Sequence, residues 1–245
     1  MTKRANAAKG TETNTSLIAA FGLPAARTMF LFGFASGLPF LLVGGTLSVW
    51  LKDSGISLES IGLISLASLA YAFKFLWAPL VDRWQLPILR KLGRRRGWLV
   101  FAQALLALCL VLMSLLTPGG GLALFVCLTV VAGWAGATQD VVVDAYRIEI
   151  APMDVQGALA ATYTLGYRIA LLISGALALL LADHLPWSLI YQAMAAIVVF
   201  TIVVTLFSPE PKLEASVMVD DGQPLLRSLA SSIVGPFRDF FSRYG

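Results

Sequence analysis

Six long apolar runs alternate with short polar segments along the chain. The first run, residues 28–51, contains 24 residues without a charged side chain. At 1.5 Å per residue, a helix of that length crosses a hydrocarbon core of about 30 Å. It is too long for a signal-peptide core and has no convincing cleavage site, so we expect a retained membrane helix. The other runs are 60–81, 98–117, 122–143, 157–181 and 189–207.

The polar segments predict how these helices are connected and oriented. Very short links, 118–121 and 182–188, join runs three to four and five to six, so those helices should be antiparallel neighbours. Of the eighteen Lys and Arg residues, fifteen fall on the side of the N-terminus and only Lys52 falls on the opposite side. Lys74 and Arg168 lie inside runs. Since basic loops stay in the cytoplasm, both termini are expected there.

The same pattern divides the chain into three segments. Residues 1–27 form a polar tail, and residues 28–207 form the six-helix bundle. Residues 208–245 form a cytoplasmic linker, in which 225–244 mix apolar and charged positions in the manner of an interfacial amphipathic helix. The fold class is therefore an all-α membrane protein.

Composition excludes most other classes. The chain is 58% hydrophobic and 13% charged, whereas soluble domains are about 25% charged. The net charge of +4 does not indicate nucleic-acid binding, because the basic residues gather in loops between apolar runs. Cys109 and Cys127 lie inside apolar runs and His184 is the only histidine. We expect no disulfide, metal site, cofactor or enzymatic activity, since no nucleotide-binding loop or Ser–His–Asp set is present.

Ionisable side chains at membrane depth are the first candidates for function, because they are costly there unless they face a partner or a wet cavity. Arg168 lies about 16 Å into the fifth run, near the bilayer midplane. It is expected to face substrate or to pair with an acid of the fourth helix. Lys74 lies about 10 Å from the cytoplasmic interface, where a lysine can also reach the surface along its stem.

The fourth run carries a face of small and polar residues within an otherwise apolar helix. Its acids lie toward the cytoplasmic end, so Asp144 is in reach of Arg147 on the same helix. Alternatively, the acids meet the basic residues of the link between the second and third runs and hold the cytoplasmic side closed. Two further alternatives are that Asp140 carries a proton, and that the face serves helix packing alone. The face consists of Thr129, Gly133, Gly136, Asp140, Asp144 and Arg147, and the gate candidates of the link are Asp82, Arg83, Arg94, Arg95 and Arg96.

A glycine pair in the first run indicates close helix packing. Gly33 and Gly37 are four residues apart, which lets a neighbouring backbone approach. Pro39 follows and is expected to bend or break this helix near its middle. A helix of this kind suits a rocking movement during transport.

Several segments resemble a known family. Residues 78–83 (APLVDR) with 93–96 (GRRR) resemble the loop between helices two and three of the major facilitator superfamily, with Ala78 in place of the usual glycine and a longer intervening segment. A finer similarity is to the muropeptide permeases (AmpG family). It is carried by 33–39 (GFASGLP), 71–80 (YAFKFLWAPL), 93–98 (GRRRGW), 137–145 (ATQDVVVDA), 165–168 (LGYR), 181–183 (LAD) and 209–211 (PEP).

The resemblance implies a proton-driven transporter of the bacterial inner membrane. Such a carrier imports anhydro-muropeptides, the products of peptidoglycan recycling that also signal β-lactamase induction. The carboxylates of this substrate suit Lys74 and Arg168, its sugar rings suit tyrosine surfaces, and Gln139 can bind hydroxyls. The tyrosines concerned are Tyr71, Tyr163 and Tyr167. Family members contain two six-helix halves, so this chain corresponds to the first and is expected to need a second.

Two other functions remain open. The same fold could carry another anionic solute, such as an acyl-CoA. From a different class, the chain could be a membrane sensor or assembly subunit that transports nothing. Loss of uptake with normal insertion in an Arg168→Ala variant favours transport, whereas loss of folded protein favours a structural arginine.

Overall fold

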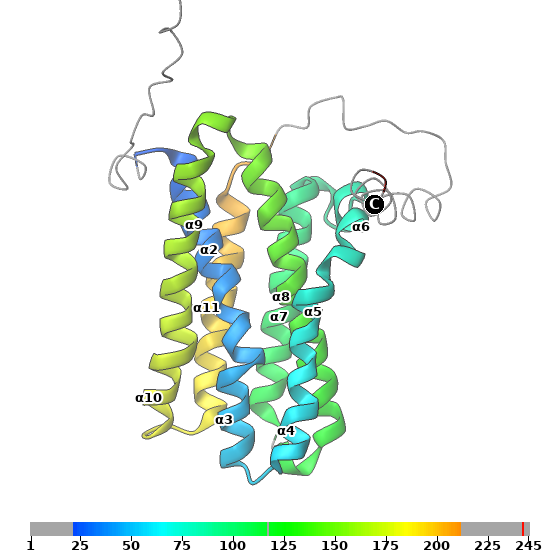
Figure 1. Ribbon diagram of the computed structural model, residues 1–245, viewed down its shortest axis with the longest axis vertical. Helices are drawn as coiled ribbons and strands as arrows, with labels where there is room; N and C mark the ends of the chain where they lie inside the picture. Colours follow the sequence, from blue (N-terminus) through cyan, green and yellow to red (C-terminus); the bar gives the residue numbers. More distant parts are fainter. Residues whose placement is uncertain (1–21, 117, 212–241, 243–245) are drawn as a thin grey trace, which may run out of the picture.

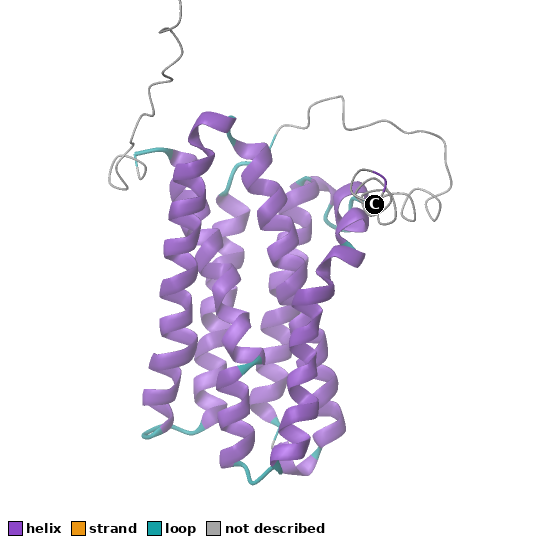
Figure 2. Ribbon diagram, viewed as in Figure 1, coloured by secondary structure: helices purple, strands orange, loops and turns teal. Residues whose placement is uncertain are grey.

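The computed structural model describes residues 22–116, 118–211 and 242. Within them all regular secondary structure is helical and no strand occurs (Figure 2). Of the predicted tail, 1–27, residues 1–21 lie outside the described residues, and α2 begins at Pro24, four residues earlier than expected. The predicted amphipathic segment, 225–244, lies outside the described residues except for Ser242. Six helices in the described part are long and apolar enough to cross a membrane, which confirms the predicted all-α membrane fold. These spans are Pro24–Asp53, Leu58–Leu76, Arg94–Leu115, Leu122–Ile150, Met153–Ala182 and Trp187–Phe207.

Three of the six described spans consist of more than one helical element. The first contains α2 and α3, the second alternates α-helix with 3₁₀ turns, and the fifth contains a π-helical turn. The elements are α2 (Pro24–Val43), α3 (Gly45–Asp53), α4 (Leu58–Ser65), η1 (Leu66–Ser68), α5 (Leu69–Phe73), η2 (Lys74–Leu76), α6 (Ala78–Arg83), η3 (Arg90–Leu92), α7 (Arg94–Leu115), η4 (Pro118–Gly120), α8 (Leu122–Ile150), η5 (Met153–Val155), α9 (Gln156–Leu171), η6 (Leu172–Leu177), α10 (Ala178–Ala182) and α11 (Trp187–Phe207).

Two predicted helix ends are wrong. The second span ends at Leu76 rather than at 81, and α6 starts anew at Ala78 with Pro79 in its first turn. Proline lacks an amide hydrogen and disfavours helical geometry in the residue before it, so it begins a helix more readily than it continues one. The fourth helix runs to Ile150 instead of 143. Charged residues end an apolar run without ending the helix, because polar side chains are tolerated where a helix leaves the membrane.

The break in the first helix lies further along than expected. Helix α2 continues through Pro39 to Val43, and the chain departs from helical geometry at Gly44, with φ −110° and ψ −106°. A proline removes one hydrogen bond from the turn before it. The adjacent glycines Gly44 and Gly45 are weak helix formers, so the interruption falls there.

The six spans pack as one continuous bundle. Helix α2 lies against α9, α11 and α8, while α7 lies between α8 and α11 (Figure 1). Helix α5 packs on α8 at the edge of the bundle. In the most apolar 18 residues of each span, only 17% are buried in the second span and 28% in the fifth, against 61% in the first and 56% in the third and fourth. The second and fifth spans therefore form the outer sides of the bundle.

Two apolar clusters fill the core at different depths. The larger surrounds Trp50 and Tyr191, whose rings lie 4.4 Å apart between centroids. The smaller surrounds Phe32 and Tyr146, which meet edge to face at 4.9 Å. On α2 and α8 the residues between the clusters are small or polar and include Ser36 and other buried groups described below. A polar layer therefore crosses the bundle between two dry regions.

Candidate functional site

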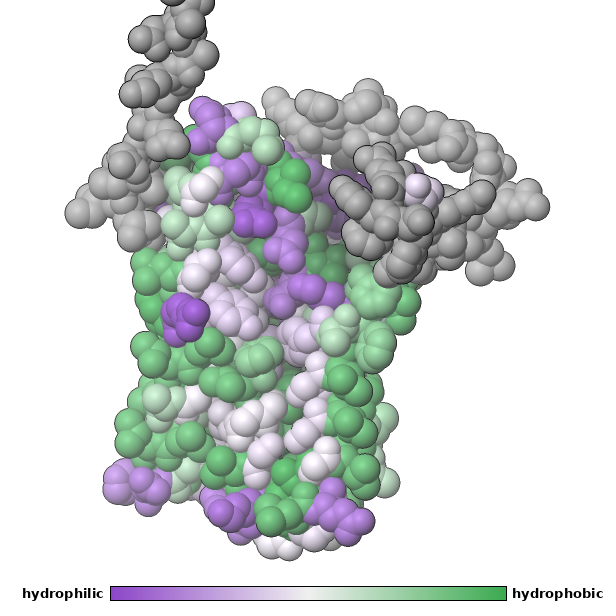
Figure 3. All heavy atoms as spheres, in the orientation of Figure 1, coloured by the Kyte–Doolittle hydropathy of each residue, from purple (hydrophilic) through white to green (hydrophobic). Residues whose placement is uncertain are grey.

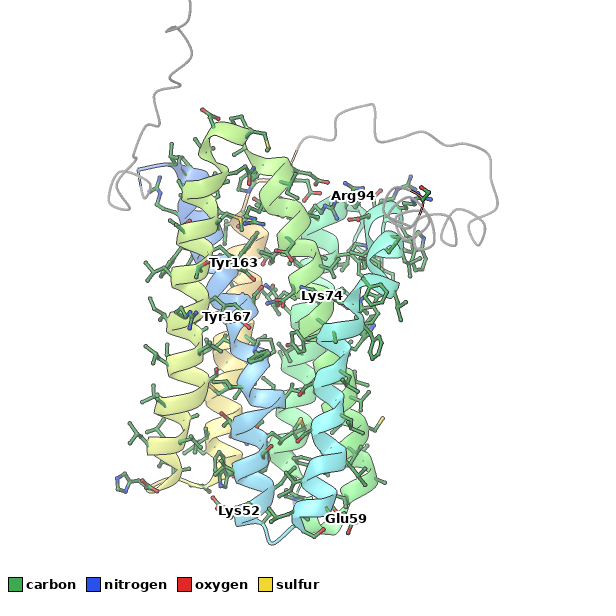
Figure 4. All side chains as sticks on the ribbon, in the orientation of Figure 1. Lys52, Glu59, Lys74, Arg94, Tyr163 and Tyr167 are labelled. Atoms are coloured by element: carbon green, nitrogen blue, oxygen red, sulfur yellow. The ribbon has the colours of Figure 1, made fainter. Side chains whose placement is uncertain are left out.

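A lysine and two aspartates meet in the polar layer. The Lys74 ammonium lies 3.5 Å from a carboxylate oxygen of Asp144 and 3.9 Å from one of Asp140. Both acids project from α8 one turn apart, as their four-residue spacing predicts. Lys74 starts the 3₁₀ turn η2, and the indole of Trp77 at its far end donates to Thr138 on α8. Lys74 therefore points toward the bundle centre (Figure 4). The structure differs from the alternative in which the lysine stem extends to the cytoplasmic interface.

Four buried polar groups near this ion pair form no hydrogen bond of standard geometry among the described residues, although the Ser36 hydroxyl lies close enough to the Asp140 carboxylate to interact with it. They come from three spans, and Gln139 is only 1% exposed. Buried polar groups are nearly always satisfied by protein, water or ligand, because leaving one unsatisfied costs about 1–3 kcal/mol. A cluster of them identifies a place suited to water or a polar ligand. The atoms are Ser36 Oγ, Tyr71 Oη, Gln139 Nε2 and Asp140 Oδ1.

A cavity of about 460 Å³ opens beside Asp140. Its wall is largely aromatic: the rings of Tyr163 and Tyr167 lie 6.1 Å apart, and Phe40 lies 6.5 Å from Tyr167. Figure 4 shows Tyr163 and Tyr167 on the side of α9 that faces Lys74 across the bundle. In Figure 3 this central face is polar between hydrophobic flanks. The lining residues are Phe40, Asp140, Tyr163, Thr164, Tyr167, Arg168 and Leu171.

Arg168 lies on the far wall of this cavity. It is exposed, and among the residues that the structure describes it forms no ion pair. The fourth-helix acids instead pair with Lys74, so the alternative of an Arg168 ion pair with them is not realised. The exposed face of α9 that holds Arg168 also holds Thr164 and continues to Leu172 at the start of η6. An arginine at this depth therefore faces the cavity or whatever covers α9.

A second charged cluster closes the end of the bundle where Arg94 is labelled in Figure 4. Arg95, only 4% exposed, binds Glu149 through two nitrogens at 2.5 and 2.9 Å and Asp82 at 2.7 Å. Arg94 adds a 2.9 Å bond to Glu149 and donates to the backbone carbonyl of Asp82. Bidentate arginine–carboxylate pairs of this kind are directional. The cluster therefore fastens α6, α7 and α8 together.

The start of α7 is capped by a residue distant in sequence. The carboxylate of Glu210 accepts from the backbone amides of Arg95 at 2.8 Å and Arg96 at 3.0 Å. It thereby satisfies two of the free amides at a helix N-terminus, where the helix dipole also favours negative charge. Gly93 has φ +92°, and a Cβ there would collide with the Glu210 side chain. The Tyr146 hydroxyl donates to the Pro209 carbonyl at 2.7 Å and holds the same segment.

The residue pairs of the gate hypothesis therefore need correction. The acids that meet the basic cluster are Asp82, Glu149 and Glu210, not Asp140 or Asp144. Lys74 also replaces Arg147 as the partner of Asp144. Arg83 is exposed at the end of α6. Glu149, Glu210, Ser36 and Phe40 were not among the residues selected from the sequence. The sequence did contain a signal for Glu149: it is an acidic residue just beyond the apolar run, where the helix can continue.

The glycines of the first helix form its contact with α9. A Cβ at Gly33 would collide with the Tyr163 carbonyl oxygen, and one at Gly37 would come within 2.6 Å of the Tyr167 carbonyl oxygen. Gly166 on α9 fits reciprocally against the Phe30 carbonyl. This contact of backbone against backbone holds the tyrosine wall of the cavity beside α2.

Comparison with known proteins gives the family. The sequence model of the Major Facilitator Superfamily matches residues 29–244. The chain is 43% identical to an "Anhydromuropeptide permease" of Escherichia coli over 224 residues, 91% of this chain and 43% of that protein. It is 37% identical to a "Putative transporter AmpG 4" of Rickettsia conorii over 88% of this chain and 52% of that protein.

The chain spans about half the length of these curated relatives. Their names describe transport rather than catalysis, in line with the expectation that the chain is not an enzyme. The match to the family model covers all six spans, and the match to the permease confirms the resemblance carried by the motifs. The chain is a multi-pass membrane protein that belongs to the major facilitator superfamily.

Proposed function

We propose that this chain forms half of a proton-driven carrier that imports anhydro-muropeptides into the bacterial cytoplasm. The observation that carries the proposal is the polar layer, in which Lys74, two acids and an aromatic cavity with Arg168 meet inside an apolar bundle. Similarity to a protein named anhydromuropeptide permease supplies the substrate class. Import of recycling products by this route would link the protein to β-lactamase induction.

The chemistry of the site suits such a substrate. Its carboxylates would bind Arg168 and Lys74, since both cations are at least partly exposed at depth. Its sugar rings would lie on Tyr163 and Tyr167, because aromatic faces pack well on the apolar faces of sugars. The unpartnered groups of Tyr71 and Gln139 would bind hydroxyl or amide groups.

The charged cluster at the end of the bundle would act as the cytoplasmic gate. Asp82, Arg94, Arg95 and Glu149 bind one another across three helices, so a movement of α6, α7 and α8 relative to one another has to separate them. Closing a carrier on one side while the site opens on the other is the alternating-access scheme. Arg83 and Arg96 would contribute to the positive charge of this end.

The central test is uptake of radiolabelled anhydro-muropeptide into proteoliposomes under an imposed proton gradient, for this chain and for a form extended by six further helices. We expect the extended form alone to transport, because one half leaves the cavity lined by α2, α8 and α9 open on one side. Absence of uptake by both forms, each correctly inserted, would eliminate the muropeptide assignment. Two alternatives would then remain. A carrier of another anion, such as an acyl-CoA, would take up that solute, whereas a sensor or assembly subunit would take up none.

We expect Arg168→Ala to abolish uptake without loss of folded protein. Arg168 is exposed and unpaired among the described residues, so its removal leaves no charge uncompensated there. The loss should exceed about tenfold, since a charge-assisted contact contributes about 1.5–3 kcal/mol. The matched control is Arg27→Ala, an exposed arginine at the start of α2, which should transport normally. Reduced amounts of folded protein in Arg168→Ala would show a structural role instead.

Both termini are proposed to lie in the cytoplasm of a bacterium with the chain in its inner membrane. In a background with Cys109→Ala and Cys127→Ala, we expect a membrane-impermeant maleimide to label Lys52→Cys in spheroplasts and Lys91→Cys only after lysis. Both positions are exposed, and they lie at opposite ends of the bundle. The reverse labelling pattern would invert the proposed orientation.

A further inference from the structure

The connection between α6 and α7, residues 84–92, has an inner and an outer face. The backbone amides of Leu89 and Leu92 each donate to the carbonyl three residues earlier, so side chains three positions apart share a face. Leu89, Leu92 and the equivalent Leu86 are partly buried. Ile88 belongs to the outer face and is 93% exposed. The connection therefore turns a large apolar side chain away from the protein.

This connection lies beside the first turns of α7 rather than beyond the end of the bundle. The indole of Trp98 donates to the Trp84 carbonyl at 2.8 Å, and the two rings meet edge to face. Trp98 follows the start of α7 at Arg94 by about 6 Å along the helix axis, and no charged residue follows it in this helix. Trp84 is 47% exposed at this boundary between charged and apolar sequence. Tryptophan is enriched where lipid headgroups meet acyl chains, and the connection fits that depth.

The outer face also carries positive charge. Arg90 and Lys91 are exposed, and in the described parts of the chain neither forms an ion pair. Residues 83–96 include six basic side chains and no acid. The acids of the charged cluster and Glu210 bind the start of α7 instead. The charge of Arg90 and Lys91 is therefore available to an anion.

Contacts within the protein hold the connection in this arrangement. The Gln85 side-chain amide donates to the Arg90 carbonyl at 3.3 Å. A Cβ at Gly97 of α7 would lie 3.4 Å from the Leu89 carbonyl oxygen, so the connection packs closely on that helix. The basic and apolar side chains thus share one face before any ligand arrives. A ligand that contacts both loses less of its binding free energy to the ordering of the protein.

We propose that residues 84–92 bind anionic phospholipids of the membrane leaflet at this end of the bundle. Arg90 and Lys91 bind lipid phosphates, and Ile88 and Trp84 lie among the first methylenes of the acyl chains. Basic residues beside apolar ones are typical of segments that lie in a membrane interface, and each such cation raises binding to an anionic surface about fivefold. This lipid contact is independent of the solute that the chain transports.

A lipid fits the outer face better than a protein partner does. The leaflet offers phosphates directly beside hydrocarbon, which matches two cations beside an isoleucine on one short segment. A second six-helix half, or a further segment of this chain, would have to place acids beside apolar residues at the same depth. Figure 1 shows α6, which leads into the connection, at the outer edge of the bundle. Lipid can therefore reach this face from the side.

The first test measures lipid preference by native mass spectrometry, with phosphatidylglycerol and phosphatidylethanolamine supplied in equal amounts. We expect this chain and the form extended by six helices both to retain phosphatidylglycerol preferentially. Arg90→Ser/Lys91→Ser should lower the preference about 25-fold, since two cations contribute about fivefold each. The matched control Arg27→Ser/Lys52→Ser removes the same charge from exposed positions elsewhere and should keep the preference. An unchanged preference in the first variant, or none in either wild-type form, overturns the proposal.

The second test locates the outer face with a nitroxide attached to Ile88→Cys, in a Cys109→Ala/Cys127→Ala background and in vesicles that contain phosphatidylglycerol. We expect the label to collide with oxygen but not with a water-soluble nickel chelate, as a label among acyl chains does. Asp154→Cys, an exposed position in the link between α8 and α9, is the control and should collide with the chelate. Collision of the label at position 88 with the chelate would show a hydrated face, and collision with neither reagent would show a protein partner. Either result overturns the proposal.

Discussion

Gly166→Leu should remove most of the folded protein from the membrane. A Cβ at this position would collide with the Phe30 carbonyl oxygen, and two further α2 backbone atoms, including the Phe34 nitrogen at 2.9 Å, lie in its way. Backbone atoms cannot rotate aside as a side chain does, so α2 and α9 would have to separate. Overpacking costs about 1–3 kcal/mol even where side chains can adjust. We expect at least about 3 kcal/mol here, because the contact continues along the helix through Gly33.

The measurement is the fraction of monodisperse protein that survives heating in detergent, together with the amount in the membrane. Gly157→Leu is the matched control on the same helix, because nothing lies within 4 Å of a Cβ at Gly157. It should insert and melt as the wild type does. Equal behaviour of the two variants would show that the α2–α9 contact is loose in the membrane and can accommodate side chains.

Arg95→Ala should destabilise the protein by about 2–4 kcal/mol. Breaking a buried ion pair costs about 3–5 kcal/mol, and we lower this range because Asp82 and Glu149 are 47% and 28% exposed in their side chains. The variant leaves Glu149 with Arg94 alone and Asp82 without its side-chain partner. Arg95→Lys should be intermediate, since a lysine keeps the charge but cannot reproduce the bidentate geometry.

A double-mutant cycle separates this pair from general damage. Arg95→Ala, Glu149→Ala and the double variant are compared by thermal unfolding, and the double variant should be more stable than the sum of the single losses predicts. Arg90→Ala is the control, because Arg90 is exposed and outside the cluster. Additive losses would mean that Arg95 and Glu149 stabilise the protein independently, and the gate assignment would lose its physical basis.

The sequence predicted the spans well because apolar runs of this length have one stable outcome in a membrane. It predicted the ends less well. A charged residue ends an apolar run whether or not the helix ends there, so the last two turns of α8, with Glu149, were missed. The interruption falls at Gly44 instead of Pro39, because the two adjacent glycines are weak helix formers and the prediction considered only the proline.

The site was predicted as a set of residues but not as a set of pairs. Lys74, Asp140, Asp144 and Arg168 were identified because charges are rare at membrane depth. Which acid meets which base depends on the rotation of each helix. The 3₁₀ turn η1 precedes Lys74 and rotates the end of the second span relative to a continuous α-helix, and Lys74 meets both acids. The spacing of residues along the sequence does not predict that rotation.

The capping of α7 by Glu210 has a consequence for biosynthesis. The bond between the Arg95 amide and Glu210 spans 115 residues. When the third span enters the membrane, its first amides can bind only water, and they wait until the sixth span has been inserted. Pairing of such distant residues is slow, because the intervening chain must first be ordered. A ribosome that stalls before Pro209 would therefore leave a bundle with all its spans, held at this end by the cluster of Asp82, Arg95 and Glu149 but with the first amides of α7 still uncapped. Quality control could recognise the premature product by these uncapped amides.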